Sequence, residues 1–257
     1  MRLAVKVGTS TLAYPTGRMN IRQMEALCRV LSDLKNAGHE VILVSSGAIA
    51  MGVGRLGLRE RPADMPTKQA AAAVGQCELM DTYDRMFGAY GHTIDQLLVT
   101  GEDLKHPARH ENFRGTLLRL LEMGALPIIN ENDTVATEEI AVGDNDTLGA
   151  LVAVSVEAQV LVLLSDIAGL YTANPHDHPD ATLIPEVRSI TPDIRALAGG
   201  KGSALGTGGM VTKLNAAEIC VENGTDMIIA DGRRPELLYD VVEGRAVGTR
   251  FVRRNDP

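Results

Sequence analysis

One stretch of the sequence gathers aspartates and asparagines into a short polar run: Asn130-Glu131-Asn132-Asp133-Thr134-Val135-Ala136-Thr137-Glu138-Glu139-Ile140-Ala141-Val142-Gly143-Asp144-Asn145-Asp146. The apolar residues 126–129 precede it, and a segment of small apolar residues, 148–156, follows it. The acids and amides therefore lie where a buried strand ends and a helix begins, which is where open α/β folds bind ligands. Short side chains that both donate and accept suit an amine and a carboxylate on one small molecule. A surface turn with helix caps is the alternative, because Asn, Asp and Gly are also turn residues.

Length and composition limit the kinds of protein that this sequence encodes. The chain has 257 residues, of which 45% are hydrophobic, so it can bury the core of one large α/β domain or two small ones. Its net charge of −8 argues against nucleic acid or an anionic membrane as the main partner. Aromatic residues make up 3% and there are 26 glycines, which favours ligand loops built from backbone over stacking platforms.

The cysteines and the hydropathy pattern indicate a cytoplasmic protein. Cys28, Cys77 and Cys220 are odd in number and widely spaced, so they predict buried free thiols in a reducing compartment, without a disulfide framework or a metal site. No signal peptide is visible, and no apolar run approaches the roughly 20 residues of a membrane span.

Strand and helix patterns alternate along the whole chain. Strands are expected at 3–7, 41–44, 93–99, 126–129, 160–164 and 226–230, and helices at 21–37, 67–87, 112–123, 147–158, 210–223 and 236–242. This alternation predicts an α/β fold with three layers and a mostly parallel sheet. Residues 137–142 are expected to form a short strand, and a soft division near residue 143 separates an N-terminal from a C-terminal lobe.

Three segments have the form of phosphate-binding loops. Lys6 ends the first strand beside Gly8-Thr9-Ser10, Ser45-Ser46-Gly47 joins a strand to a helix, and the glycine-dense residues 199–209 lead into a helix with Lys213 in its first turn. Backbone N–H groups at such turns and a nearby ammonium group attract phosphate. Each segment alone also fits a structural role: a surface lysine, a serine cap or a flexible loop. The histidines at 176 and 178 are more typical of a solvated loop than of a metal site.

Taken in order, six segments resemble the amino acid kinase family over almost the whole chain. They are Val5-Lys6-Val7-Gly8-Thr9-Ser10, Val44-Ser45-Ser46-Gly47-Ala48-Ile49-Ala50, Pro127-Ile128-Ile129-Asn130-Glu131-Asn132-Asp133, Val142-Gly143-Asp144-Asn145-Asp146, Leu164-Ser165-Asp166 and Gly206-Thr207-Gly208-Gly209-Met210-Val211-Thr212-Lys213. The third and fourth segments resemble the members that act on free glutamate more than those that act on acetylglutamate, aspartate, carbamate or UMP.

The resemblance implies a three-layer α/β/α sandwich that phosphorylates the γ-carboxylate of L-glutamate with ATP and Mg²⁺, the first step of proline biosynthesis. It implies catalytic roles for Lys6, Lys213 and Asp146, with the aspartate between the lysines. The implied glutamate-binding residues are Ser46, Asp133, Asn145, Asn130 and Asp144. The implied ATP-binding residues are Lys6, Ser165, Asp166, Thr207, Gly208, Gly209, Met210, Val211, Thr212 and Lys213. The N-terminal lobe, 1–143, would bind glutamate and the C-terminal lobe, 144–257, would bind ATP.

The resemblance carries further expectations. The chain resembles the short form that lacks a C-terminal PUA domain, and it is expected to form a homo-oligomer, dimer or tetramer. Glutamate-5-semialdehyde dehydrogenase, which uses the product, is a candidate transient partner. Protein ligands for Mg²⁺ are not evident, so phosphates and water are expected to hold the metal. Segments 172–180 and the region near Thr137 are candidate lids.

Two other functions stay open from the sequence. One is a relative that acts on another carboxylate, although Asp133 and Asp144 favour a substrate with a free amine. The other is a catalytically silent amino acid sensor, against which stands the presence of Lys6, Lys213 and Asp146 together. The chemistry itself fits a kinase without a general base, because a carboxylate nucleophile is already ionised at neutral pH.

Overall fold

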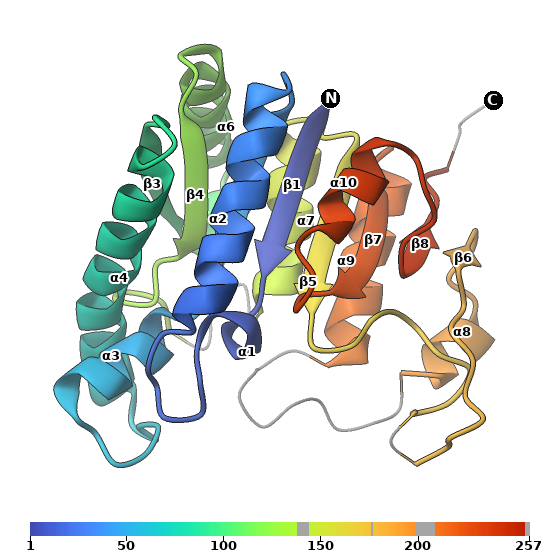
Figure 1. Cartoon of the computed structure of the whole chain (residues 1–257), viewed down its shortest axis with the longest axis horizontal. Coiled ribbons are helices and arrows are strands. Elements are labelled where there is room, and N and C mark those ends of the chain that lie inside the picture. The colour runs from blue at the N-terminus through green and yellow to red at the C-terminus, as the bar shows by residue number, and fades with distance from the viewer. Residues whose placement is uncertain (138–143, 176, 199–208, 255–257) are drawn as a thin grey trace.

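The computed structural model describes residues 1–137, 144–175, 177–198 and 209–254 of the chain. Within these residues one sheet forms the centre of the molecule, with the strand order β3-β4-β2-β1-β5-β7-β8-β6 (Figure 1). Its strands are β1 (Arg2–Val7), β2 (Glu40–Ser45), β3 (Ile94–Val99), β4 (Leu126–Glu131), β5 (Val160–Ser165), β6 (Glu186–Val187), β7 (Asp226–Asp231) and β8 (Thr249–Phe251). Paired strands of the described sheet run parallel except β7 and β8, which are antiparallel.

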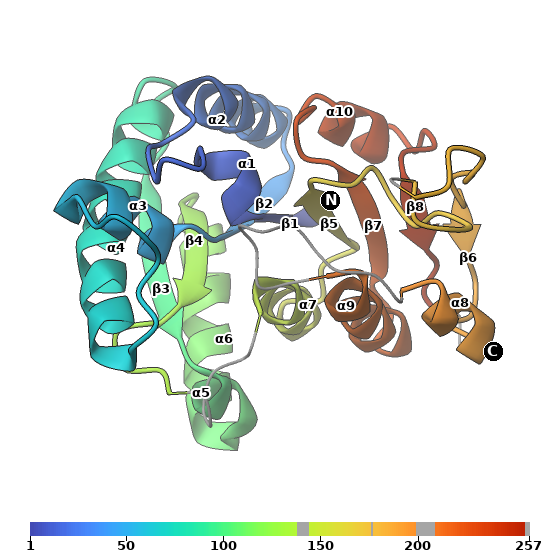
Figure 2. The ribbon, with the colours of Figure 1, turned by 90° about the horizontal axis from the view of Figure 1, so that it is seen from below.

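Helices cover both faces of this sheet (Figure 2). On one face lie α1, α2, α4 and α10, and on the other lie α6, α7 and α9. The described helices are α1 (Thr9–Leu12), α2 (Ile21–Asn36), α3 (Ala48–Leu56), α4 (Met65–Gly88), α5 (Gly101–Lys105), α6 (Pro107–Glu122), α7 (Asn145–Ser155), α8 (Pro192–Ala196), α9 (Met210–Glu222) and α10 (Leu237–Val242). The predicted three-layer α/β fold with a mostly parallel sheet is confirmed.

The sheet divides the hydrophobic core into two clusters, and β1 contributes to both. Leu3, Val5 and Val7 pack with α2 and α4, whereas Ala4 packs with α6, α7 and α9. Successive side chains of a strand point to opposite faces. Lys6 therefore faces the same side as Ala4, toward α7, and this orientation determines which helix its side chain follows.

Helix α4 packs closely on α3 through glycines. A Cβ atom on Gly52 would collide with the Ala71 carbonyl oxygen, and one on Gly75 would collide with the Ala48 carbonyl oxygen. The alanine-rich run that the sequence shows in this helix thus serves a close helix–helix contact inside the chain. This contact fixes the start of α3, which directly follows Ser46 and Gly47.

Several predicted boundaries were wrong by a few residues. Strand β4 continues through Glu131, so Asn130 lies inside the strand and not after it. Helix α6 begins at Pro107, which suits the first turn because proline lacks an N–H to satisfy there. Helix α7 begins at Asn145, because the Asp144 carboxylate accepts hydrogen bonds from the backbone N–H groups of Asp146 and Thr147.

Short elements escaped the sequence patterns, namely α1, α5, α8, β6 and β8. The predicted strand at 137–142, the glycine loop at 199–208 and His176 fall wholly or largely outside the described residues. In the part of the chain that is described, no helix combines the length and apolar character needed to cross a bilayer.

Candidate active site

A cleft of about 560 Å³ opens at the carboxyl ends of the central strands. Parallel strands bring their carboxyl ends to the same end of the sheet. The chain builds the sheet outward from β1 in both directions, with β2 on one side and β5 on the other, and this switch in strand order leaves a crevice there. Most of the described residues predicted to bind or react line this cleft: Lys6, Ser46, Asn130, Asp133, Asp144, Asn145, Asp146, Ser165, Asp166 and Lys213. Segments from both halves of the chain therefore meet at one place.

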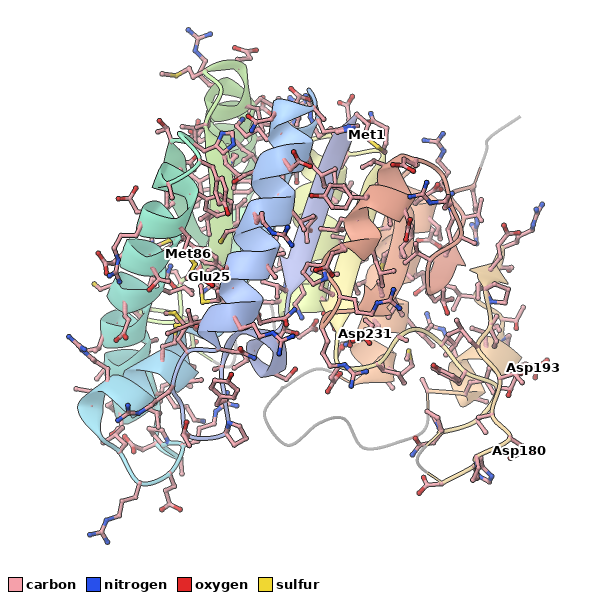
Figure 3. The ribbon with its side chains drawn as sticks, viewed as in Figure 1. Met1, Glu25, Met86, Asp180, Asp193 and Asp231 are labelled. Carbon is pink, nitrogen blue, oxygen red and sulfur yellow. The ribbon has the colours of Figure 1, made fainter. Side chains whose placement is uncertain are left out.

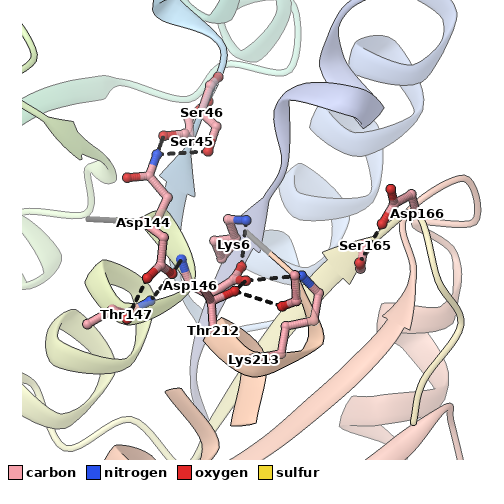
Figure 4. Close-up of polar contacts among 12 residues, drawn as sticks. Lys6, Ser45, Ser46, Asp144, Asp146, Thr147, Ser165, Asp166, Thr212 and Lys213 are labelled. Atoms are coloured by element: carbon pink, nitrogen blue, oxygen red, sulfur yellow. Dashed lines mark hydrogen bonds and ion pairs between the residues drawn. The ribbon is translucent and has the colours of Figure 1, made fainter. Parts of the chain in front are cut away.

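Asp146 lies between two lysines at the centre of the cleft (Figure 4). Lys6 Nζ donates to Asp146 Oδ1 at 2.6 Å, and Lys213 Nζ donates to Oδ2 at 3.0 Å. The Thr212 hydroxyl also donates to Oδ2, at 2.9 Å. The Asp146 side chain is 1% exposed and the lysines are 11% and 8% exposed. Two ammonium groups and one carboxylate leave an excess of positive charge facing the cleft, which suits the binding of a polyanion.

Local packing explains how Lys6 reaches Asp146. A Cβ atom on Gly149 would lie 3.3 Å from Lys6 Cβ, so a glycine on α7 leaves room for the lysine stem to run beneath the helix. Asp146 lies in the first turn of α7, where the helix dipole also favours a negative charge. The position of Lys213 near the start of α9 brings the second ammonium group to the same carboxylate.

The pKa of Asp146 records the balance of these forces. Burial alone would raise it, but the charges and hydrogen bonds of Lys6 and Lys213 outweigh burial and bring the pKa to about 2. Asp146 is thus an anion throughout the neutral range, and its two oxygens are occupied by the lysines and Thr212.

A cluster of amides and hydroxyls lines the cleft next to this triad. Asn145 Nδ2 lies 2.7 Å from Ser46 Oγ, 3.0 Å from the Ser45 carbonyl oxygen and 3.0 Å from Asn130 Oδ1. Gly47 follows with φ 105°, a left-handed conformation that glycine adopts without strain, and it begins α3. The turn at Gly47 directs Ser46 toward Asn145, which comes from a segment almost 100 residues away.

The carboxylates of Asp144 and Asp133 also line the cleft, in different surroundings. Asp144 is engaged as the cap of α7, with the Thr147 hydroxyl donating to its Oδ2 at 2.9 Å. Burial raises the pKa of Asp133 to about 6, and the positive charge of Arg61 counteracts part of that rise. A carboxylate held in a cleft with a raised pKa gains from a cationic ligand, because the ligand's charge stabilises its ionised form.

The opposite end of the cleft is formed by the ends of β5 and α9. Ser165 is buried, and its hydroxyl donates to Asp166 Oδ1 at 3.1 Å. Gly209 caps α9, and its carbonyl oxygen lies 2.8 Å from the Thr212 hydroxyl oxygen. Met210 is partly buried and Val211 is exposed, and neither is among the residues that line the cleft. Thr207 and Gly208 lie outside the described residues.

Sequence reasoning missed three cations of the cleft. Arg59 and Arg61 come from the loop between α3 and α4, and Lys68 comes from the first turns of α4. Arg59 and Arg61 are balanced in this loop by Glu60 and Asp64, so its charge gave no signal, and nothing in the sequence shows which cleft a loop borders. These side chains give the Ser46 end of the cleft positive charge that would favour a substrate carboxylate.

A larger hollow, of about 770 Å³, lies elsewhere on the molecule and lacks this chemistry. It is formed mainly by α2 and α4, which supply Glu25 and Met86, both labelled in Figure 3. Lys6, Lys213 and the amide cluster do not border it. We therefore assign the candidate site to the smaller cleft, in which the polar groups converge.

In the portion of the chain covered by the structure, no three His, Cys, Asp or Glu side chains form a group that could hold a metal ion. The Asp146 oxygens already accept hydrogen bonds from both lysines, so the most central carboxylate is not a free ligand.

Fold and cleft together define a kinase of small molecules. The model of the amino acid kinase family matches residues 1–231, and the chain belongs to this family. A solved structure, carbamate kinase from Giardia lamblia bound to AMP-PNP, shares the fold with a TM-score of 0.67 at 17% identity, over 98% of each chain.

Proteins related in sequence share far more identity with this chain than this structural neighbour does. The chain is 51% identical to the glutamate 5-kinase of Listeria innocua, over 99% of this chain and 94% of that protein. It is 53% identical to the glutamate 5-kinase of Symbiobacterium thermophilum, over 98% of this chain and 96% of that protein.

Proposed function

We propose that this chain is a glutamate 5-kinase, which transfers the γ-phosphoryl group of Mg-ATP to the γ-carboxylate of L-glutamate. The products are L-glutamyl 5-phosphate and ADP. The observation that carries the proposal is the buried Lys6–Asp146–Lys213 triad, which lies between an amide cluster and the Ser165–Asp166 end of one cleft. The identity to two glutamate 5-kinases over nearly the full chain supports the choice of substrate.

The reaction needs charge stabilisation more than it needs a base. An oxygen of the γ-carboxylate, ionised at neutral pH, forms a bond to the γ-phosphorus while the bond from that phosphorus to the β,γ-bridging oxygen breaks. ADP leaves with the electron pair of the broken bond. Lys6 and Lys213 neutralise the approaching anion and the transferred group, and Asp146 keeps both ammonium groups in place.

The two ends of the cleft divide the substrates between them. Ser46, Asn145 and Asn130 would bind glutamate carboxylate groups, Asp133 would pair with the α-ammonium group, and Asp144 would hold the start of α7 beside them. Ser165, Asp166 and the segment from Thr207 to Lys213 would hold ATP. The lobe 1–143 would thus bind mainly glutamate, and the lobe 144–257 would bind mainly ATP. Two residues cross this division: Asn145 of the second lobe would bind glutamate, and Lys6 of the first lobe would contact ATP.

Mg²⁺ would enter as part of the nucleotide substrate. Because the described residues offer no carboxylate cluster, the phosphate oxygens of ATP and water would supply most of its ligands. The ion would reduce the negative charge that the γ-carboxylate meets as it approaches the phosphate.

The proposal extends to the setting of the reaction. It places the chain in the cytoplasm at the first step of proline biosynthesis, as a homo-oligomer. Cys28 and Cys220 are buried as expected, whereas Cys77 is exposed, contrary to the expectation of three buried thiols, and a free exposed thiol fits a reducing compartment. The labile acyl phosphate would pass to glutamate-5-semialdehyde dehydrogenase.

Trapping the acyl phosphate tests reaction and substrate together. The purified chain is incubated with Mg-ATP, hydroxylamine and either L-glutamate, N-acetylglutamate or aspartate, and hydroxamate and ADP are measured. We expect hydroxamate from L-glutamate alone. Hydroxamate from one of the other two acids would assign a different substrate, and ATP binding without any hydroxamate would favour a silent amino acid sensor.

A further inference from the structure

Helix α4 contacts the proposed glutamate subsite through two buried side chains that the sequence motifs do not include. Gln76 Oε1 accepts a hydrogen bond from Asn130 Nδ2 at 2.9 Å, and the Tyr83 hydroxyl lies 2.9 Å from Ser45 Oγ. Gln76 is 8% exposed and Tyr83 is fully buried. We infer that Gln76 and Tyr83 are positioning residues that set the geometry of the glutamate subsite from behind. This inference rests on the proposed function, which assigns Ser46, Asn130 and Asn145 to glutamate.

The direction of each hydrogen bond in this network is fixed by the backbone. A carbonyl oxygen only accepts, so the Ser45 carbonyl requires that Asn145 present its Nδ2 atom. A backbone N–H only donates, so the Glu131 N–H, 2.9 Å away, requires that Asn130 present its Oδ1 atom. Asn130 Nδ2 must then face α4, and only the oxygen of the Gln76 amide can accept from it.

The arrangement forms a continuous relay from α4 to the cleft. Gln76 orients Asn130, and Asn130 Oδ1 accepts from Asn145 Nδ2, which also reaches Ser46 Oγ. Gln76 itself does not line the cleft. It therefore acts through Asn130, which contacts Asn145 at the wall of the cleft.

The nitrogen atom of the Gln76 amide bears on why this position has a glutamine. Gln76 Nε2 is buried and has no hydrogen-bond partner among the described residues. An unsatisfied buried donor is costly, so it offsets part of the stability that the bond from Asn130 contributes. The single bond accepted from Asn130 is the contact that distinguishes glutamine from methionine at this position.

Tyr83 supports the neighbouring turn. Its hydroxyl contacts Ser45 Oγ, which also donates to the Ser46 carbonyl oxygen at 3.2 Å. Gly75, directly before Gln76, allows α4 to approach the backbone of α3 at Ala48. One helix thus supports the Ser45–Gly47 turn by a backbone contact and a hydroxyl, and the amide cluster by Gln76.

The test separates glutamate binding from ATP binding in the purified chain. The hydroxamate assay is run with varied glutamate and with varied ATP for Gln76→Met, Tyr83→Phe and the wild type. Cys77→Ser, on the exposed face next to Gln76, is the control. We expect a roughly tenfold higher glutamate KM for Gln76→Met, the cost of an unpaired Asn130 amide, and a smaller rise for Tyr83→Phe. The ATP KM should not change, because Ser165 and Asp166 share none of these contacts.

A second measurement shows whether the effect passes through Asn130. In an Asn130→Ala background, Gln76→Met should no longer raise the glutamate KM, because the link between Gln76 and Asn145 is already absent. An unchanged glutamate KM in Gln76→Met, or equal rises in the KM of glutamate and ATP, would overturn the inference. If Gln76→Met does not give a folded protein, Tyr83→Phe decides, and a wild-type glutamate KM there would overturn it. A wild type that forms no hydroxamate would refute the proposed function itself.

Discussion

Lys6 Nζ and Lys213 Nζ hydrogen-bond to different oxygens of one carboxylate, that of Asp146. The lysines come from the first strand and from α9, and Asp146 comes from the start of α7. Three segments that are distant in sequence thus depend on a single side chain for their relative position. Replacement of Asp146 is therefore the most direct probe of the site.

Asp146→Asn should lower kcat for hydroxamate formation on the order of 10²- to 10³-fold, because the lysines lose the anion that orients them. The measurement is steady-state turnover with L-glutamate and Mg-ATP. Asp84→Asn, an exposed carboxylate on α4, is the control and should turn over like the wild type. Near-normal turnover in Asp146→Asn would contradict the mechanism.

Acid unfolding should show the lowered pKa of Asp146. A carboxyl group whose pKa is lower in the folded than in the unfolded state stabilises the fold above the unfolded value, and this stabilisation is lost as the pH falls through the folded value. With a pKa lowered from 3.8 to about 2, we expect about 2 kcal/mol of unfolding free energy to be lost between pH 4 and 2. Urea unfolding at stepped pH measures it, and the same step persisting in Asp146→Asn would assign it to other groups.

Lys213→Met should abolish turnover while glutamate binding is largely kept. The lysine contacts Asp146 near the α9 end of the cleft, whereas the amide cluster that would bind glutamate lies beside α3 and β4. Loss of kcat on the order of 10³-fold is expected from removing a charge at the transferred phosphoryl group. Calorimetric titration with glutamate checks binding, and Lys105→Met, at an exposed position on α5, is the control.

The glutamate KM should rise as the pH falls below about 6. Burial raises the pKa of Asp133 to about 6, so the carboxylate that would meet the α-ammonium group becomes protonated below that pH. The groups of glutamate itself keep their charge between pH 5 and 7.5, so they do not contribute. Asp133→Asn should have a high glutamate KM that changes little over this range, measured by ADP release. An equal pH dependence in both proteins would exclude Asp133 as the cause.

Gly47→Ala should cost about 1–2 kcal/mol of stability, since a left-handed φ of 105° strains any residue with a Cβ atom. It should also raise the glutamate KM, because the turn places Ser46. Gly38→Ala is the matched variant: its φ is 90°, and an added Cβ there would meet no atom within 4 Å. A similar loss of melting temperature in both variants, with a raised glutamate KM in Gly47→Ala alone, would agree with this role. A wild-type KM in Gly47→Ala would not.

Much of the fold was predictable because its signals are local. Buried strands such as 160–164 appear in the sequence as apolar runs. Asn20 is typical of a helix N-cap, and its side chain accepts a hydrogen bond from the Gln23 backbone N–H at the start of α2. The polar run that begins at the end of β4 correctly indicated the end of the sheet at which the cleft lies. Elements of two to five residues, such as β6 and α8, carry too few residues for a periodic pattern and were missed.

The site could be predicted only in part, since its geometry depends on contacts across the fold. The motif residues Lys6, Asp146 and Lys213 were named from the sequence, and the structure brings them together. Gln76 and Tyr83 were not, because an amide or a hydroxyl on an alanine-rich helix gives no local sign of its partner. The capping role of Asp144 was likewise hidden, because asparagine or aspartate before a helix fits a cap and a ligand equally well.

The order of the segments along the chain also orders events during synthesis. Ser46, Asn130 and Asn145 leave the ribosome before Lys213, which is supplied by α9. Asp146 is thus synthesised before the second of its two ammonium partners, and its buried carboxylate is fully paired only once α9 has joined the fold.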